Sequence, residues 1–139
     1  MSETLRLSLL SPERKIFENI EVTSVNLPGA EGALQVLPGH ADFVSTLETG
    51  PFSFVPVQSV DQYGSSGVIS SGFFEVRQGH VIVCAETLEF KGEIDLERAK
   101  KAQAKAEQAL TDANIDEEKF KKYQLKLQRA LVRQQEANL

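Results

Sequence analysis

The first two thirds of the chain carry short apolar runs with the alternation of β-strands. Leu5, Leu7 and Leu9 alternate with Arg6 and Ser8, which is the period of a strand with one buried face. Further runs rich in β-branched and aromatic residues, separated by Gly and Pro turns, predict strands within 20–27, 34–36, 43–47, 52–57, 68–76 and 81–83. Short strands at this spacing predict an all-β sandwich or barrel.

From residue 94 onward the pattern changes to that of helices. Asp95 is suited to cap a first helix, and Asn114, followed by Glu117 three residues later, resembles a capping box that opens a second. Both runs repeat at spacings of three and four, which places their small and apolar residues on one face: Ala99, Ala102, Ala106, Ala109 and Ala113, then Phe120, Tyr123, Leu127, Ala130 and Gln134. The short break between the two runs predicts an antiparallel hairpin.

The alanine-rich face predicts a weakly held hairpin. A buried leucine or phenylalanine contributes roughly 1.5–3 kcal/mol, and each missing CH₂ group loses about 0.8 kcal/mol. Helices that meet mainly through alanine therefore pack closely but gain little free energy from burial. We expect the hairpin to separate without unfolding the β part, and a chain that ends after Glu89 to keep its fold.

Composition places a boundary near Lys91-Gly92-Glu93. All nine glycines and all five prolines precede residue 94, whereas the later residues are strong helix formers. Acidic residues outnumber basic ones before the boundary, and basic residues outnumber acidic ones after it. We therefore expect a β domain over residues 1–90 and a helical domain over residues 91–139.

Charge and missing motifs argue against several functions. The net charge of −5 is unfavourable for nucleic-acid binding. The chain has no glycine-rich phosphate loop and no nucleophile elbow, and His40 and His80 lack the spacing of metal ligands. The single cysteine, Cys84, lies in an apolar run, where we expect a buried and inert thiol. The residues alone give no positive case for catalysis, a metal or a required cofactor.

Five segments then carry a family resemblance when they are taken in order. They are residues 11–18 (SPERKIFE), 28–32 (PGAEG), 37–41 (LPGHA), 71–76 (SGFFEV) and 94–99 (IDLERA). With the helical pair that follows, they closely resemble the epsilon subunit of F-type ATP synthases over essentially the whole chain. The resemblance implies a β-sandwich of about ten strands followed by a C-terminal antiparallel two-helix hairpin.

The resemblance also implies a function. In this family the protein is a non-catalytic subunit of the central stalk, whose sandwich binds the gamma subunit and the c-ring and couples them for proton-driven ATP synthesis. The hairpin can extend along gamma into the alpha/beta catalytic head, where it inhibits ATP hydrolysis. For a bacterial member, the implied location is peripheral, on the cytoplasmic face of the inner membrane.

Candidate contacts with the rotor and c-ring follow from the same resemblance. They are Glu31, Pro38, Gly39 and His40. The family commonly has a glutamate and a glycine where this chain has Ala33 and Gln35, so we expect no polar contact with the c-ring through Ala33. Simple turn chemistry is the competing explanation for Pro38-Gly39-His40.

Some bacterial members bind regulatory ATP on the folded hairpin through an Ile/Leu-Asp-x-x-Arg-Ala motif and arginines of the second helix. The residues that match are Ile94, Asp95, Arg98 and Ala99 in the motif, Arg129 and Arg133 on the second helix, and Glu89 as an upstream acid. The competing interpretation makes Asp95 a helix cap and Arg98 a solvated or ion-paired residue. The sequence favours this second interpretation, because the motif also occurs in members that bind ATP poorly or not at all.

A second class of function fits the same pattern of strands and helices. A small β-barrel enzyme could use the hairpin to dimerise. This alternative predicts a self-sufficient dimer, whereas a rotor subunit predicts a stoichiometric complex with gamma.

Overall fold

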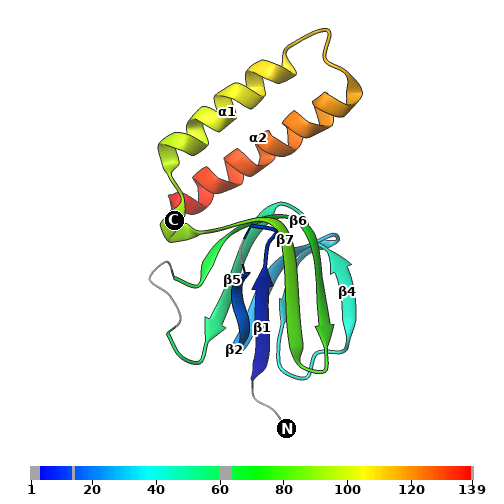
Figure 1. Cartoon of the computed structure of the whole chain (residues 1–139), viewed down its shortest axis with the longest axis vertical. Coiled ribbons are helices and arrows are strands. Elements are labelled where there is room, and N and C mark those ends of the chain that lie inside the picture. The colour runs from blue at the N-terminus through cyan, green and yellow to red at the C-terminus, as the bar shows by residue number, and fades with distance from the viewer. Residues whose placement is uncertain (1–3, 14, 60–63, 139) are drawn as a thin grey trace.

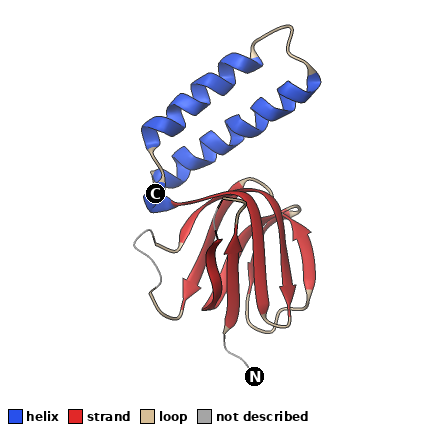
Figure 2. Cartoon of the chain, viewed as in Figure 1, coloured by secondary structure: helices blue, strands red, loops and turns tan. Residues whose placement is uncertain are grey.

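The computed structural model describes residues 4–13, 15–59 and 64–138, which form a body of β-strands with a helical hairpin at one end (Figure 1). The described residues contain seven strands: β1 (Leu5–Leu10), β2 (Lys15–Gly29), β3 (Gly32–Val36), β4 (Phe43–Thr46), β5 (Gly50–Pro56), β6 (Ser66–Arg77) and β7 (His80–Phe90). A short 3₁₀ turn, η1 (Lys91–Glu93), leads to helices α1 (Leu96–Leu110) and α2 (Glu117–Ala137). Figure 2 shows the strands and the helices as two separate bodies.

The seven strands belong to one sheet that closes on itself. The strand order is β1-β7-β6-β5-β2-β3, with β4 paired to β6, and β1 also pairs with β2. The path from β1 to β2 is therefore a closed ring, which is why the sequence pattern suited both a sandwich and a barrel. The pairing of β1 with β7 is parallel and joins the first strand to the last one.

The long strands β2 and β6 each pair with different neighbours along their length. β2 pairs with β1 through its first half and with β3 and β5 through its second half. β6 pairs with β5 before a bend at Ser71 and Gly72, where φ is 57° and 123°, and with β4 after it. The family resemblance implied about ten strands, and the described residues form seven, because one bent strand takes the place of two straight ones.

The core of the sandwich extends to the last residue of β7. Phe17 packs edge-on against Phe54 and Phe90, with ring centroids 5.7 and 5.9 Å apart. Phe90 is buried and also contacts Phe52. A chain that ended after Glu89 would lack this ring, so the expectation that such a chain keeps its fold stays a prediction, and the structure adds that Phe90 belongs to the β core.

The expectation of a buried thiol at Cys84 is wrong. The sequence predicted a buried thiol, but Val83 and Ala85 are the buried neighbours, and Cys84 is half-buried because alternate residues of a strand face opposite sides. Partial burial still raises the pKa of the Cys84 thiol by desolvation.

The helical hairpin begins as predicted and turns later than predicted. The Asp95 carboxylate accepts a hydrogen bond from the Arg98 backbone N–H at 3.1 Å, which confirms it as the cap of α1. α2 is capped by Asp116, whose Oδ1 accepts from the Lys119 N–H at 2.7 Å. The predicted cap at Asn114 is wrong, because that residue lies in the turn and donates its own N–H to Asp112.

The two helices meet through small residues. Ala99, Ala106 and Ala130 are the buried residues of the hairpin, and Gln134 donates a side-chain hydrogen bond to Gln103 across the pair at 2.6 Å. Among the described residues, no helix has both the length and the apolar character needed to cross a bilayer.

Candidate functional site

A cleft of about 470 Å³ lies where the hairpin meets the sandwich. Four residues that the sequence singled out line this cleft: Glu89, Arg98, Arg129 and Arg133. The fifth, Asp95, is not one of the lining residues, and its carboxylate caps α1. The structure thus brings most of the predicted group together and gives Asp95 the structural role that was the competing interpretation.

Simple periodicity explains how these side chains converge. In β7, Leu88 and Phe90 point into the core, so Glu89 between them faces outward. Arg129 and Arg133 are four residues apart on α2 and therefore share a face. Because the helices run antiparallel, the first turn of α1, which carries Arg98, lies beside the last turns of α2 (Figure 1).

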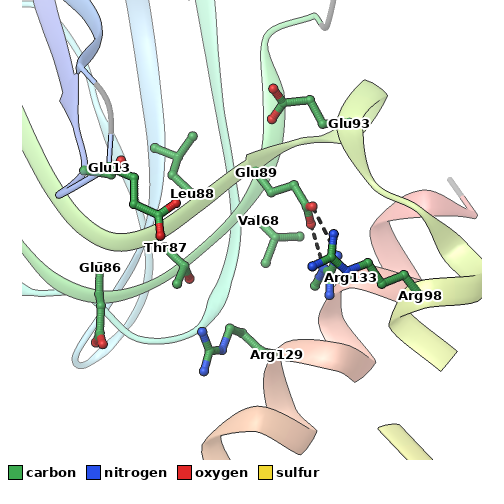
Figure 3. Close-up of a pocket in the computed structure, with 11 residues that line it drawn as sticks. Glu13, Val68, Glu86, Thr87, Leu88, Glu89, Glu93, Arg98, Arg129 and Arg133 are labelled. Atoms are coloured by element: carbon green, nitrogen blue, oxygen red, sulfur yellow. Dashed lines mark hydrogen bonds and ion pairs between the residues drawn. The ribbon is translucent and has the colours of Figure 1, made fainter. Parts of the chain in front are cut away.

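An ion pair joins the sandwich to the hairpin inside the cleft. Arg133 donates from Nε to Glu89 Oε1 at 2.6 Å and from Nη2 to Oε2 at 3.1 Å (Figure 3). The side chains are 18% and 29% exposed. Two parallel, partly desolvated bonds make this pair stronger than an isolated pair on the surface. It is a specific attachment of α2 to β7.

Charge is divided across the cleft. The wall from the sandwich and η1 carries carboxylates, at Glu13, Glu86, Glu89 and Glu93, and the wall from the hairpin carries arginines, at Arg98, Arg129 and Arg133. Figure 3 shows Arg98 beside Arg133, while the guanidinium of Arg129 points toward the side where Glu86 and Thr87 lie. The two parts of the molecule therefore face each other with opposite charge.

A second groove of about 310 Å³ runs between the helices and shares the three arginines with the cleft. Lys105, Lys126 and Tyr123 line it as well, and the Lys126 ammonium lies 5.4 Å from the centre of the Tyr123 ring. The described residues that line this groove include five cations and no carboxylate. Such a surface can hold an anion with several charges.

Sequence reasoning missed Lys105 and Lys126 because each resembles an ordinary solvated lysine. Their spacing could have revealed them. Lys105 lies seven residues after Arg98, and Lys126 lies three residues before Arg129, so each shares a helical face with an arginine of the cleft.

The predicted contacts with the c-ring do not form one cluster. Glu31 is exposed in the turn before β3, whereas Pro38, Gly39 and His40 follow the same strand. The five residues of β3 separate the two groups by roughly 17 Å. His40 is exposed, with its Nδ1 2.7 Å from the carbonyl oxygen of Ala41.

The loop that carries His40 leads to the tip of the β6–β7 hairpin. Asp42 accepts a hydrogen bond there from the Gln78 N–H at 2.9 Å. Since β7 runs from this tip to the linker of the helices, the tip and the helical hairpin lie at opposite ends of the sandwich (Figure 1).

Comparison with known proteins identifies the family. The beta-sandwich domain of the ATP synthase delta/epsilon chain matches residues 4–91, and the long alpha-helix domain of the same chain matches residues 93–137. The chain belongs to the ATP synthase delta/epsilon family. This result confirms the resemblance and the fold class that the five segments predicted.

Individual relatives agree with this assignment. The chain is 41% identical over 142 residues to the ATP synthase epsilon chain of Geotalea daltonii, covering 99% of this chain and 96% of the relative. It is 36% identical over 137 residues to the epsilon chain of Geobacter sulfurreducens, with the same coverage. It is thus an epsilon subunit of ATP synthase and a non-catalytic component of that complex, which sets aside the β-barrel enzyme.

Solved structures support the fold. A chain of the Euglena gracilis mitochondrial ATP synthase, in a structure of its OSCP, F1 and c-ring, superposes with a TM-score of 0.78 at 23% identity, over 95% of this chain and 80% of that one. A chain from the central stalk and c-ring of the Tetrahymena thermophila enzyme gives a TM-score of 0.64 at 13% identity, over 91% and 95%.

Proposed function

We propose that this epsilon subunit sits in the central stalk, where its sandwich joins the gamma subunit to the c-ring for proton-driven ATP synthesis. We further propose that its hairpin inhibits ATP hydrolysis by extending into the alpha/beta head. The observation that carries the proposal is the narrow attachment of the hairpin, which contacts the sandwich mainly through α2 against β5 and β6 and contacts the linker turn η1. An element held this way can detach as a unit.

An exposed apolar face of the sandwich suits a protein partner. Val44 on β4 is 64% exposed and Phe73 on β6 is 49% exposed. Cys84 on β7 pairs with Phe73 and also faces outward. Exposed apolar side chains that lie together are typical of docking surfaces, and we assign this face to gamma. The exposed loop at Pro38, Gly39 and His40 is assigned to the c-ring.

The proposed location is the cytoplasmic face of a bacterial inner membrane. The subunit would be held there through the c-ring and gamma, as a peripheral protein. The bacterial relatives at 36–41% identity support a bacterial assembly.

Removing the hairpin tests the inhibitory role. A chain that ends before Ile94 should raise ATP hydrolysis by the reconstituted complex, because no element remains to enter the head. A bifunctional thiol cross-link between Glu89→Cys and Arg133→Cys, in a Cys84→Ser background, should raise hydrolysis in the same way by holding the hairpin down. The same variant without cross-linker is the control. Unchanged hydrolysis in both the deletion and the cross-linked complex would contradict the proposal.

We also propose that ATP is a regulatory ligand of the folded hairpin. Arg98 and Lys105 from α1 and Arg129 from α2 face the same groove, so one triphosphate could contact both helices. A ligand that binds only the paired helices stabilises that pairing by mass action. The groove has no glycine-rich phosphate loop, so we expect an affinity in the micromolar to millimolar range.

Calorimetric titration of the isolated subunit with ATP tests this site. Arg98→Ala/Arg133→Ala should weaken or abolish the binding heat. The matched control is Lys100→Ala/Lys121→Ala, which removes the same charge at lysines that pair with Glu97 and Glu117 outside the groove. Absence of heat at millimolar ATP, or equal binding by the two double variants, would remove ATP from the proposal.

A further inference from the structure

The Glu89–Arg133 ion pair occupies one of the two edges through which the Arg133 guanidinium can bind phosphate. Arg133 directs Nε and Nη2 at the two oxygens of one carboxylate. An arginine presents its donors as a rigid fork, and the same fork binds a phosphate through two parallel bonds. A carboxylate and a phosphate therefore compete for this edge of Arg133.

The position of Arg133 makes that competition relevant to any anion in the groove. Arg133 lines both the groove between the helices and the cleft beside the sandwich. A phosphate-rich anion that contacts Arg98 and Arg129 therefore lies within reach of Arg133. The acidic wall of the sandwich repels the same anion, since Glu86 and Glu89 both line the cleft.

We propose that Glu89 is an internal competitor of phosphate for Arg133, so that a phosphate-rich anion takes the Nε–Nη2 edge of Arg133 only by displacing the carboxylate of the sandwich. The choice of ATP as the natural anion rests on the proposed function, but the competition itself does not. Such an anion joins α1 to α2 and at the same time removes one attachment of α2 to β7. Pairing of the helices and attachment of the hairpin to the sandwich are then separate, oppositely regulated contacts.

Calorimetry of the full-length subunit with inorganic triphosphate tests the competition. Glu89→Gln keeps the shape of the side chain and frees Arg133, and it should tighten triphosphate binding by roughly three- to tenfold. Glu86→Gln removes the same charge from the same wall, where no ion pair with Arg133 is formed. This control should tighten binding by no more than about twofold, through long-range repulsion alone.

A double-variant cycle separates competition from a general effect on folding. In an Arg133→Ala background, Glu89→Gln should improve binding no more than Glu86→Gln does, because the contested group is gone. The inference is overturned if Glu89→Gln weakens triphosphate binding, matches Glu86→Gln in the wild-type background, or keeps its full advantage without Arg133.

The two proposals fail in different ways. If triphosphate shows the cycle and ATP gives no heat, the competition stands and ATP is not the ligand. If ATP binds without the cycle, the nucleotide site stands and the competition is wrong. If neither anion binds, both proposals are wrong.

Discussion

Gly72 is the residue on which the bend of β6 depends. Its φ of 123° lies in a region that L side chains rarely adopt. A Cβ added there would also meet the Cys84 carbonyl oxygen and the Cα of Ala85 on the neighbouring strand. The backbone conformation and the close contact both occur where the pairing of β6 changes from β5 to β4. A side chain at this position would therefore oppose the closure of the sheet.

Alanine at Gly72 should therefore destabilise the protein more than alanine at another left-handed glycine. Gly79 has a φ of 78° and nothing within 4 Å of an added Cβ, so Gly79→Ala should cost only the backbone strain, about 1 kcal/mol. Gly72→Ala should lower the free energy of unfolding by at least about 2 kcal/mol. Urea unfolding of both full-length variants measures the difference, and equal losses would show that the close approach to β7 is unimportant.

At the scale of elements, the cap at Asp116 fixes where the second helix starts. Asp116→Ala should lower the local stability of the first turn of α2 by about 1 kcal/mol, because the Lys119 N–H loses the side-chain oxygen that accepts its hydrogen bond. Asn114→Ala should change it by only a few tenths of a kcal/mol, since Asn114 lies in the turn. Amide hydrogen exchange at Lys119 and Phe120 measures the loss of protection in each variant. A greater loss in the Asn114 variant than in the Asp116 variant would mean that Asn114 caps α2, as the sequence predicted.

The sequence predicted the elements whose apolar or small residues recur at the regular spacing of a strand or a helix. Alternating leucines marked β1, and alanines at helical spacing marked the hairpin. The side of the sheet on which Cys84 lies was hidden because its neighbours from Val81 to Ala85 are all apolar, so no alternation shows which residues face inward. The start of α2 was missed because Asn114 and Asp116 are both good caps, and the turn from Asp112 to Ile115 decides between them.

Four residues that line the candidate site could be predicted from the sequence, but the ion pair between two of them could not. Arg98, Arg129 and Arg133 could be grouped because two antiparallel helices bring their ends together. The bond between Glu89 and Arg133 could not be predicted, since the residues are 44 positions apart and each looks like an ordinary surface charge. Only the docking of α2 against β5, β6 and η1 brings them into contact.

At the scale of the whole molecule, the β part should fold without the helices, provided that it includes Phe90. A chain that ends after Gly92 keeps that buried ring, and we expect it to fold and to support ATP synthesis in the assembled complex. A chain that ends after Glu89 should be less stable by about 3 kcal/mol, the usual cost of removing a buried phenylalanine. Thermal unfolding compares the two truncations, and equal melting temperatures would mean that Phe90 is dispensable.

The parallel pairing of β1 with β7 has a consequence for biosynthesis. β1 can pair with β2 early, but its other edge has no partner until His80–Cys84 have left the ribosome. Non-local pairing of this kind is slow, because a long loop must close before its contacts form. The open edge of β1 is meanwhile a template for pairing with other nascent chains. The helices are translated last, so closure of the sheet and exit of the hairpin from the ribosome fall in the same short interval.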